Sequence, residues 1–353
     1  MERTMPSLGK SLGSIRRRSV DLSNFSPVKE SLLGPEETLP LIIEPAADHV
    51  DLAEWVRNSR ADVDRKMAKH GGILFRGFGL KDAREFQRVA AALTNELFAD
   101  YGDLPRESLA EKVYASTPYP EDKMILYHNE SSHMASWPSR INFFCMIVAK
   151  EGGATPIVDC RKVYKSLDPK VREAFEQKGL KYIRNFCEGL DVSWQRFFST
   201  DDRAAVEEQC RAMGTTCEWT GKDNLRISQL CRGVLRHPIT GEMCFFNQVQ
   251  LHHVHCLDKE TLDAMLSIFS RDDLPRDVQY GDGTPIEDSV MDHIGEMYEK
   301  HAVRFQYQPG DMVSLDNMLV AHARDTFSGP RKIVVALGDM VEGHVLDAAA
   351  QPA

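Results

Sequence analysis

The stretch Leu126-Tyr127-His128-Asn129-Glu130 decides how this chain is interpreted, because it ends an apolar run and carries an imidazole and a carboxylate two residues apart. The apolar run predicts a strand, and side chains two apart on a strand point to the same face. We therefore expect His128 and Glu130 to project together while Asn129 turns away. These two side chains are two-thirds of a two-histidine, one-carboxylate iron site, which leaves coordination positions open. A lone His-x-Glu triplet is weak evidence, so the rest of the chain must supply the remainder.

Candidates for a third metal ligand and for a residue that binds a cosubstrate both lie near the C-terminal end. An expected strand over 312–315 leads through Asp316 and Asn317 into an apolar approach to His322. Early and late strands of a jelly roll are neighbours, so that fold can bring His322 to His128. Arg331 begins the last expected strand, and arginine binds a carboxylate through two parallel hydrogen bonds. A metal beside such an arginine suits a chelating 2-oxo acid.

The wider pattern predicts a mainly β fold with peripheral helices, built on a double-stranded β-helix (jelly-roll) core, because many short strands alternate with polar turns. Residues 36–345 are expected to form a single domain, since no repeat and no linker interrupts them. Residues 1–35 are expected to form a flexible basic tail. Its arginine- and serine-rich beginning also has the composition of a transit peptide, which is the alternative interpretation.

Hydrophobic periodicity assigns most of the remaining chain. A long excursion over 95–122 is expected to lead to the His128 strand as part of a lid, and about sixty residues before Cys244 show no pattern. The expected helices are 48–69, 82–93, one from Asp168 to before Gly179, one after Asp258 and 286–300, and the expected strands are 39–43, 73–75, 124–130, 141–148, 155–159, 181–184, 244–251, 303–307, 312–315 and 332–337.

Composition excludes several classes of function. The formal net charge of −10 argues against a nucleic-acid partner, which requires a basic face. No apolar run approaches the length of a membrane span, so no membrane association is expected. The 8 cysteines form no CxxC pair and no framework spacing, which predicts reduced thiols in a cytoplasmic protein.

Several stretches together resemble the TauD/TfdA family of iron(II)/2-oxoglutarate dioxygenases, and more closely its SyrP-like branch of amino-acid hydroxylases. The resemblance runs from about Leu39 to Met340, and motifs in the right order are more specific than any one alone. The stretches are Tyr127-His128-Asn129-Glu130, Glu151-Gly152-Gly153-Ala154-Thr155-Pro156, Phe246-Asn247-Gln248, Tyr280-Gly281-Asp282-Gly283 and Asp316-Asn317…His322-Ala323-Arg324…Gly329-Pro330-Arg331-Lys332.

This resemblance implies residue roles. His128, Glu130 and His322 match the iron ligands, and Arg331 matches the arginine that holds the distal carboxylate of 2-oxoglutarate. Thr155 matches a threonine whose hydroxyl helps bind this cosubstrate. Many relatives carry aspartate where Glu130 stands, a change that alters reach and keeps the charge. Lys332 neighbours Arg331, and strand alternation allows only one of them to point inward; we favour the arginine.

Other residues are assigned with open alternatives. Asn247 and Gln248 are candidates to hydrogen-bond the substrate or, equally, to satisfy backbone groups at a strand end. Arg324, two residues after His322, is a candidate to face the active site. The cluster His252, His253 and His255, in which the last two would share one strand face, could line the pocket or hold zinc. The metal-site histidines could instead be hydrogen-bonded core residues, and Arg331 could form a surface ion pair.

The expected function is hydroxylation of an unactivated C–H bond in a small-molecule substrate. The resemblance implies iron(II) as cofactor, 2-oxoglutarate and dioxygen as cosubstrates, and an amino acid or a carrier-protein-bound aminoacyl group as substrate in natural-product biosynthesis. Halogenation is disfavoured because Glu130 occupies the position that halide would take. Desaturation, a non-amino-acid substrate, a non-catalytic jelly-roll binding protein and a cupin-like zinc hydrolase are the alternatives. A homo-oligomer is compatible with the sequence.

Overall fold

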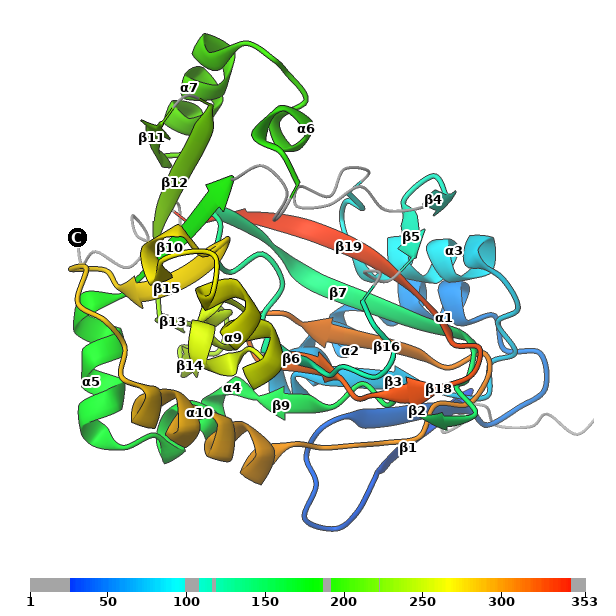
Figure 1. The fold of residues 1–353 in the computed structure, drawn as a ribbon. Coiled ribbons are helices and arrows are strands. Elements are labelled where there is room, and N and C mark those ends of the chain that lie inside the picture. Colours follow the sequence, from blue (N-terminus) through cyan, green and yellow to red (C-terminus); the bar gives the residue numbers. More distant parts are fainter. Residues whose placement is uncertain (1–25, 99–107, 116–118, 187–191, 222, 344–353) are drawn as a thin grey trace, which may run out of the picture.

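The structure, a computed structural model, describes residues 26–98, 108–115, 119–186, 192–221 and 223–343 (Figure 1). An eight-stranded sheet forms its largest layer, with the order β1-β2-β3-β16-β7-β19-β5-β4. Its strands are β1 (Val28–Leu32), β2 (Leu41–Pro45), β3 (Gly72–Phe75), β4 (Ser108–Ala110), β5 (Val113–Ala115), β7 (Ser136–Ile147), β16 (Met312–Asp316) and β19 (Lys332–Glu342).

Two neighbouring strands of this sheet, β7 and β19, carry apolar side chains on both faces. Phe144 of β7 and Val334 of β19 pack in a hydrophobic cluster with the helices that cover one face. Their sequence neighbours Phe143 and Val335 point the other way and line a cavity. The period of two along a strand divides the side chains between the two sides. The near-continuous apolar run over 141–148 is therefore a strand covered on both faces, as predicted.

Smaller sheets complete the fold. A three-stranded sheet, β6-β17-β9, faces the cavity from the other side, and a four-stranded sheet, β11-β12-β10-β15, lies beyond it (Figure 1). Two antiparallel pairs of short strands, β13-β14 and β18-β8, complete the sheets. The strands are β6 (Ile125–His128), β8 (Glu151–Gly152), β9 (Ile157–Asp159), β10 (Leu180–Phe186), β11 (Thr216–Thr220), β12 (Asn224–Cys231), β13 (Val234–Arg236), β14 (Met243–Phe245), β15 (Arg276–Tyr280), β17 (Val320–Arg324) and β18 (Phe327–Ser328).

Aspartates cap several of the peripheral helices. Asp82, Asp168 and Asp258 each accept a backbone N–H in the first turn, as the sequence predicts for the last two. No described helix is long and apolar enough to cross a membrane. The helices are α1 (Leu52–Asn58), α2 (Arg60–His70), α3 (Ala83–Leu93), α4 (Cys160–Ser166), α5 (Pro169–Lys178), α6 (Trp194–Phe198), α7 (Arg203–Ala212), α8 (Val249–His252), α9 (Lys259–Leu266) and α10 (Asp288–His301), with 3₁₀ turns η1 (Val254–Cys256) and η2 (Arg271–Asp273).

Three expected elements are wrong. The expected tail over 1–35 contains β1, which pairs along its whole length with β2, so the sheet begins before residue 36. Residues 1–25 of that tail lie outside the described part of the chain. The expected helix over 48–69 is interrupted at Ser59, whose N–H bonds to Trp55 and Val56 close α1 before α2 begins. The expected strand over 303–307 forms only an isolated bridge, between Ile157 and Val303.

Two further regions differ because tertiary contacts override weak local patterns. The expected strand over 244–251 ends at Phe245, and α8 follows. His253 separates α8 from the 3₁₀ turn that contains His255, so the two histidines share no strand face. The stretch before Cys244 that shows no pattern contains α6, α7, β11 and β12, which lie together at the top of the view in Figure 1. These elements pack around a small cluster of their own that includes Trp194 and Val206.

Candidate active site

His128, Glu130 and His322 meet at one end of the cavity. Their ligand atoms all lie within 4.8 Å of one another. Glu130 Oε2 is 3.8 Å from Nε2 of His128 and 3.7 Å from Nε2 of His322. This set of two imidazoles and one carboxylate fits the donors that non-haem iron(II) prefers. The predicted juxtaposition of these three residues is therefore present.

Strand pairing places the two histidines. His322 lies on β17, the middle strand of its sheet, and its register partner on β6 is His128. Directly opposite residues of an antiparallel pair point to the same face. The rings accordingly lie with their centroids 4.2 Å apart, and the His322 ring also packs on Phe143, at 5.0 Å.

Glu130 is positioned by a turn rather than by the strand that the sequence predicts, since β6 ends at His128. The buried side chain of Asn317 accepts a hydrogen bond from the backbone N–H of Glu130 at 2.8 Å and donates to its carbonyl at 2.9 Å. Asn129 turns away, as expected, and donates to the carbonyl of Asn317 at 2.7 Å. The two asparagines thus clamp the turn that carries the carboxylate.

A hydrogen bond to the backbone orients His128. Its Nδ1 lies 2.8 Å from the carbonyl oxygen of Leu126, which places the proton on Nδ1. The unprotonated Nε2 then faces the carboxylate and is available to a metal. Such an outer hydrogen bond is the usual way in which proteins hold a metal-binding histidine in one tautomer.

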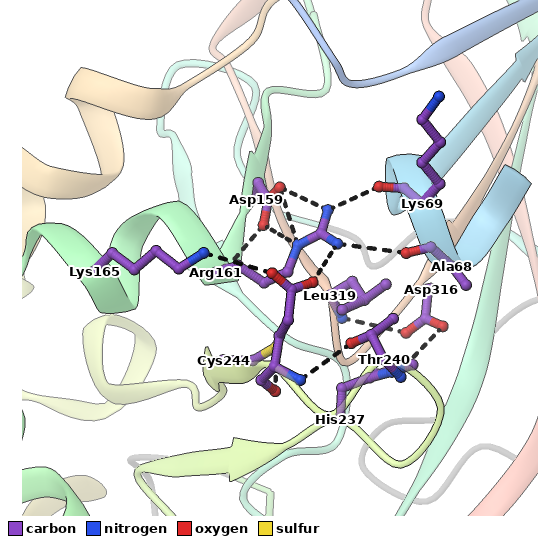
Figure 2. A network of polar contacts seen from close by, with 11 residues as sticks. Ala68, Lys69, Asp159, Arg161, Lys165, His237, Thr240, Cys244, Asp316 and Leu319 are labelled. Carbon is purple, nitrogen blue, oxygen red and sulfur yellow. Dashed lines mark hydrogen bonds and ion pairs between the residues drawn. The ribbon is translucent and has the colours of Figure 1, made fainter.

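A buried polar network supports the strands behind the three ligands (Figure 2). Arg161 forms an ion pair with Asp159 of β9 at 2.8 Å and donates to the carbonyl oxygens of Ala68 and Lys69 on α2. Asp316 accepts from the backbone N–H groups of Met318 and Leu319, and it lies 3.2 Å from the ring nitrogen of His237. Asp159 is paired with β17, and Asp316 precedes Asn317, so the network holds both ligand-bearing segments.

Burial raises the pKa of Glu130 to about 7. Its side chain is only 14% exposed, and the charged form loses hydration there. The pKa in the folded protein is above that of the unfolded chain, so the folded state holds the proton more tightly. The resulting loss of stability is absent below about pH 4.5, grows as the pH rises, and is complete above about pH 7.

Glu130→Gln should therefore stabilise the metal-free protein in a pH-dependent way. We expect the gain in the free energy of unfolding over the parent to be small at pH 5 and to reach about 2 to 3 kcal/mol at pH 8. Urea unfolding with a chelator present at both pH values would measure it. A gain that is the same at both pH values would show that the carboxylate is not neutral in the folded metal-free protein.

Arg331 and Thr155 lie together on the same cavity. Arg331 donates through Nε to the carbonyl of Gly153 at 3.0 Å and through Nη2 to Thr155 Oγ1 at 3.4 Å. Its guanidinium also lies over the ring of Phe327, at 5.4 Å. Burial lowers the pKa of Arg331, which reflects a charge that lacks an anionic partner. A carboxylate entering the cavity would supply that partner.

The glycine pair before Thr155 is required by this arrangement. Gly153 has φ +70°, and a Cβ atom on it would lie 3.0 Å from Cδ of Arg331. A side chain there would therefore displace the arginine as well as strain the backbone. Lys332, the competing basic residue, begins β19 and does not line the cavity.

The cavity has a volume of about 710 Å³, which is typical of small-molecule sites. His128, Glu130, His322, Thr155 and Arg331 all line it. The end of the excursion predicted over 95–122 contributes Tyr119, and the following Lys123 reaches across to α9 through an ion pair with Asp258 at 2.7 Å. Residues 99–107 and 116–118 of the excursion lie outside the described residues.

The three candidate substrate residues occupy different positions. Asn247 is buried outside the cavity lining, where it donates to the carbonyl of Gly233 and accepts from Val249 N–H. Gln248 lines the cavity and donates to the carbonyl of Asn129. Arg324 also lines it and donates to three backbone carbonyls, those of Tyr119, Pro120 and Lys123. The three side chains are thus bonded to backbone groups.

The three histidines of the cluster also differ in whether they line the cavity. His252 lines the cavity, whereas His253 and His255 do not. His253 lies 3.1 Å from the carbonyl of Ile286, and His255 pairs with Asp292 at 2.8 Å. Among the described residues, the group with metal-ligand geometry is His128, Glu130 and His322. The three histidines of the cluster do not form such a group in the described structure.

The sequence did not indicate the part of the cavity wall that α8 and β15 form. Gln250 and Arg276 line it from α8 and β15. Neither belongs to a recognisable motif, and α8 lies where a strand was expected. The only signal was the proximity of Gln250 to the Phe-Asn-Gln stretch at 246–248.

Comparison with known sequences identifies relatives over most of the chain. The sequence profile described as "Taurine catabolism dioxygenase TauD, TfdA family" matches residues 36–337. The dapdiamide synthesis protein DdaC of Enterobacter agglomerans is 37% identical over 284 residues, which cover 80% of this chain and 86% of that protein. A clavaminate synthase-like protein of Arabidopsis thaliana is 27% identical over 324 residues, covering 89% and 92%.

Solved structures share the fold at low identity. The PvcB protein of Pseudomonas aeruginosa superposes with a TM-score of 0.53 at 13% identity, covering 89% of this chain and 91% of that one. A structure of PvcB described as an Fe, alpha-ketoglutarate dependent oxygenase from an isonitrile synthetic pathway has a TM-score of 0.52 at 14% identity, covering 93% and 98%. The prediction of a jelly-roll core is confirmed.

Proposed function

Since the chain belongs to the TauD, TfdA family and is an iron(II)- and 2-oxoglutarate-dependent dioxygenase, we propose that it hydroxylates an unactivated C–H bond of an amino acid or an amino-acid-derived molecule. The observation that carries the proposal is the cluster of His128, Glu130 and His322 on the cavity that Arg331 also lines. A family fold alone would not require these side chains to converge.

We assign the iron ligands to Nε2 of His128, the carboxylate of Glu130 and Nε2 of His322. Three protein ligands on one side of an ion leave positions for a chelating cosubstrate and for dioxygen. The Asn317 clamp and the Leu126 carbonyl preorganise two of these ligands, so little rearrangement accompanies metal binding. The carboxylate at position 130 also leaves no ligand position for a halide, which favours hydroxylation over halogenation.

We assign the distal carboxylate of 2-oxoglutarate to Arg331, with the hydroxyl of Thr155 as a further hydrogen-bond donor to it. The arginine is partly buried and its Nε is already held by Gly153, so its remaining donors are fixed in direction. When bound, iron would use dioxygen to convert a C–H bond to an alcohol, with 2-oxoglutarate as the co-reductant that is converted to succinate and carbon dioxide. The protein contributes orientation of the cosubstrate and the substrate within one cavity.

The class of substrate is supported by sequence similarity. The relative at 37% identity takes part in dapdiamide synthesis, and the alignment covers 86% of its length. We therefore place this enzyme in natural-product biosynthesis. We further propose a cytoplasmic location, because the described cysteines are free thiols, several of them buried.

An anaerobic titration of the metal-free protein with iron(II) and 2-oxoglutarate tests the proposal. A visible metal-to-oxo-acid charge-transfer band should appear at one equivalent of each. On admission of dioxygen with a suitable amino acid, succinate and hydroxylated product should form in equal amounts. Absence of the band from a protein that circular dichroism shows to be folded would remove the cofactor assignment, whereas a dehydrogenated product would replace hydroxylation by desaturation.

A further inference from the structure

The wall formed by α8 and β15 has no role in holding the metal or the cosubstrate. These two elements pack against each other and contribute Gln250 and Arg276 to the cavity. In Figure 1, β15 and β18 are on opposite sides of β6. Arg276 belongs to β15, whereas Arg331 follows β18 in the chain.

Arg276 differs from the other cations that line the cavity. Lys123 is paired with Asp258, Arg324 donates to three backbone carbonyls, and Arg331 donates to Gly153 and Thr155. Within the described part of the chain, the guanidinium of Arg276 has no hydrogen bond, ion pair or ring contact. A half-buried arginine without an acceptor offers its planar set of donors to a ligand.

Among the described residues, no acid pairs with Arg276. Its register partner across the ladder on β10 is Arg184, which is also an arginine and cannot accept a hydrogen bond. The metal charge would be balanced by Glu130 and by the metal-bound carboxylate of 2-oxoglutarate, and the distal carboxylate would balance Arg331. Arg276 therefore has donors that a carboxylate of the substrate can use.

Gln250 adds a second, independent requirement. The residue is 7% exposed, and its Oε1 is buried without a hydrogen-bond partner in the described structure. A buried carbonyl oxygen that lacks a donor is destabilising and is usually satisfied by a ligand or a neighbour. In the structure this oxygen is not exposed to the cavity that Gln250 lines, and a rotation of the side chain on ligand binding would let it accept an ammonium or amide N–H of the bound molecule. Because α8 packs on β15, one molecule in the cavity adjoins both residues.

On the basis of the proposed function, we infer that this wall recognises the head group of an α-amino acid. Arg276 binds the free carboxylate through paired hydrogen bonds, and Gln250 Oε1 accepts an N–H from the amino group. The rest of the substrate then extends towards the iron ligands. A head group whose carboxylate is an amide, or a thioester to a carrier protein, lacks the charge that Arg276 requires. The enzyme accordingly acts on the free acid.

The test uses the full chain loaded anaerobically with iron(II) and 2-oxoglutarate, and it measures binding rather than turnover. Substrate binding next to the metal shifts the charge-transfer band. The probes are the L- and D-forms of the protein amino acids as free acids, each matched with its primary amide. At least one free acid should shift the band, and its amide should bind about 30-fold more weakly or worse, as expected for loss of a charge-assisted pair.

Variants assign the effect to the wall. Arg276→Gln should raise the Kd of the free acid about 30-fold and leave that of its amide within about threefold, so the preference for the acid disappears. Gln250→Leu should weaken the acid and the amide alike, by about tenfold. Arg271→Gln removes an exposed arginine of η2 that does not line the cavity, and should leave both affinities unchanged.

The outcomes separate the inference from the proposed function. If the parent forms the band but amides bind as well as acids, if no acid shifts the band, or if Arg276→Gln leaves the preference intact, the inference is overturned and the cofactor assignment stands. If the parent forms no band, the proposed function fails and the inference fails with it. Formation of the band by Arg276→Gln confirms that this variant is folded around an intact metal site.

Discussion

His322→Ala should abolish iron binding at micromolar concentrations, eliminate the charge-transfer band with 2-oxoglutarate and lower turnover by about a thousandfold or more. The imidazole is one of three protein ligands, and even outer-shell changes cost about 10- to 100-fold in metal affinity. His322 lies on the central strand of its sheet directly opposite His128, so its loss removes one of the two paired imidazoles. Anaerobic metal titration with spectroscopy measures the first two effects, and succinate formation measures the third.

His70→Ala is the matched control. This histidine is also buried, but it lies on α2 outside the cavity, where its Nδ1 is 2.7 Å from the carbonyl of Thr38. Its loss should lower stability without changing the metal stoichiometry. A His322→Ala protein that still binds one iron with parental affinity would show that the cluster is structural and that the two histidines are core residues.

Arg331→Ala should raise the KM for 2-oxoglutarate by about 100-fold or more while leaving iron affinity in the metal-only titration near that of the parent. A partly buried guanidinium with fixed donors makes charge-assisted hydrogen bonds, and each of these contributes about 1.5 to 3 kcal/mol. The side chain is held by Gly153 and Thr155 and faces the cavity, so its removal leaves the distal carboxylate without a partner. Initial rates and the band at increasing 2-oxoglutarate concentrations provide the two measurements.

Lys332→Ala controls for the loss of a positive charge at the same end of β19. Lys332 does not line the cavity, so the KM should change less than about threefold, the size expected for a distant, solvent-screened charge. The reverse pattern, with Lys332→Ala impaired and Arg331→Ala near normal, would reassign the distal carboxylate to the lysine and would mean that the strand alternates in the other sense.

The sequence predicted elements best where one short-range rule decided the outcome. The apolar run over 141–148 became β7, and the capping aspartates Asp168 and Asp258 became helix starts. It failed where distant contacts decided. The segment over 249–251 has the composition of a strand, yet it forms α8, which packs against β15. Propensity differences are small compared with the stabilisation that such packing provides.

The candidate site shows the same division. The residue types and the order of His128, Glu130, His322 and Arg331 were readable from the sequence because metal and carboxylate recognition use few side chains, in recurring motifs. The clamp of Asn317 on Glu130 was not readable, since it links backbone groups that are far apart along the chain. The wall of Gln250 and Arg276 was not readable either, because each residue is ordinary until α8 and β15 bring them to one cavity.

By itself, the sequence determined the chemistry this protein can carry out: an iron site of two histidines and a carboxylate, an arginine for a 2-oxo acid, and a β framework able to join the two ends of the chain. Only the tertiary structure decided how these groups are placed relative to one another and to a substrate. The pairing of β6 with β17 sets the ligand geometry, and the packing of α8 on β15 brings Gln250 and Arg276 to the same cavity. Ligand type is a property of single residues, whereas selectivity for a substrate depends on distances between segments that only the folded chain brings together.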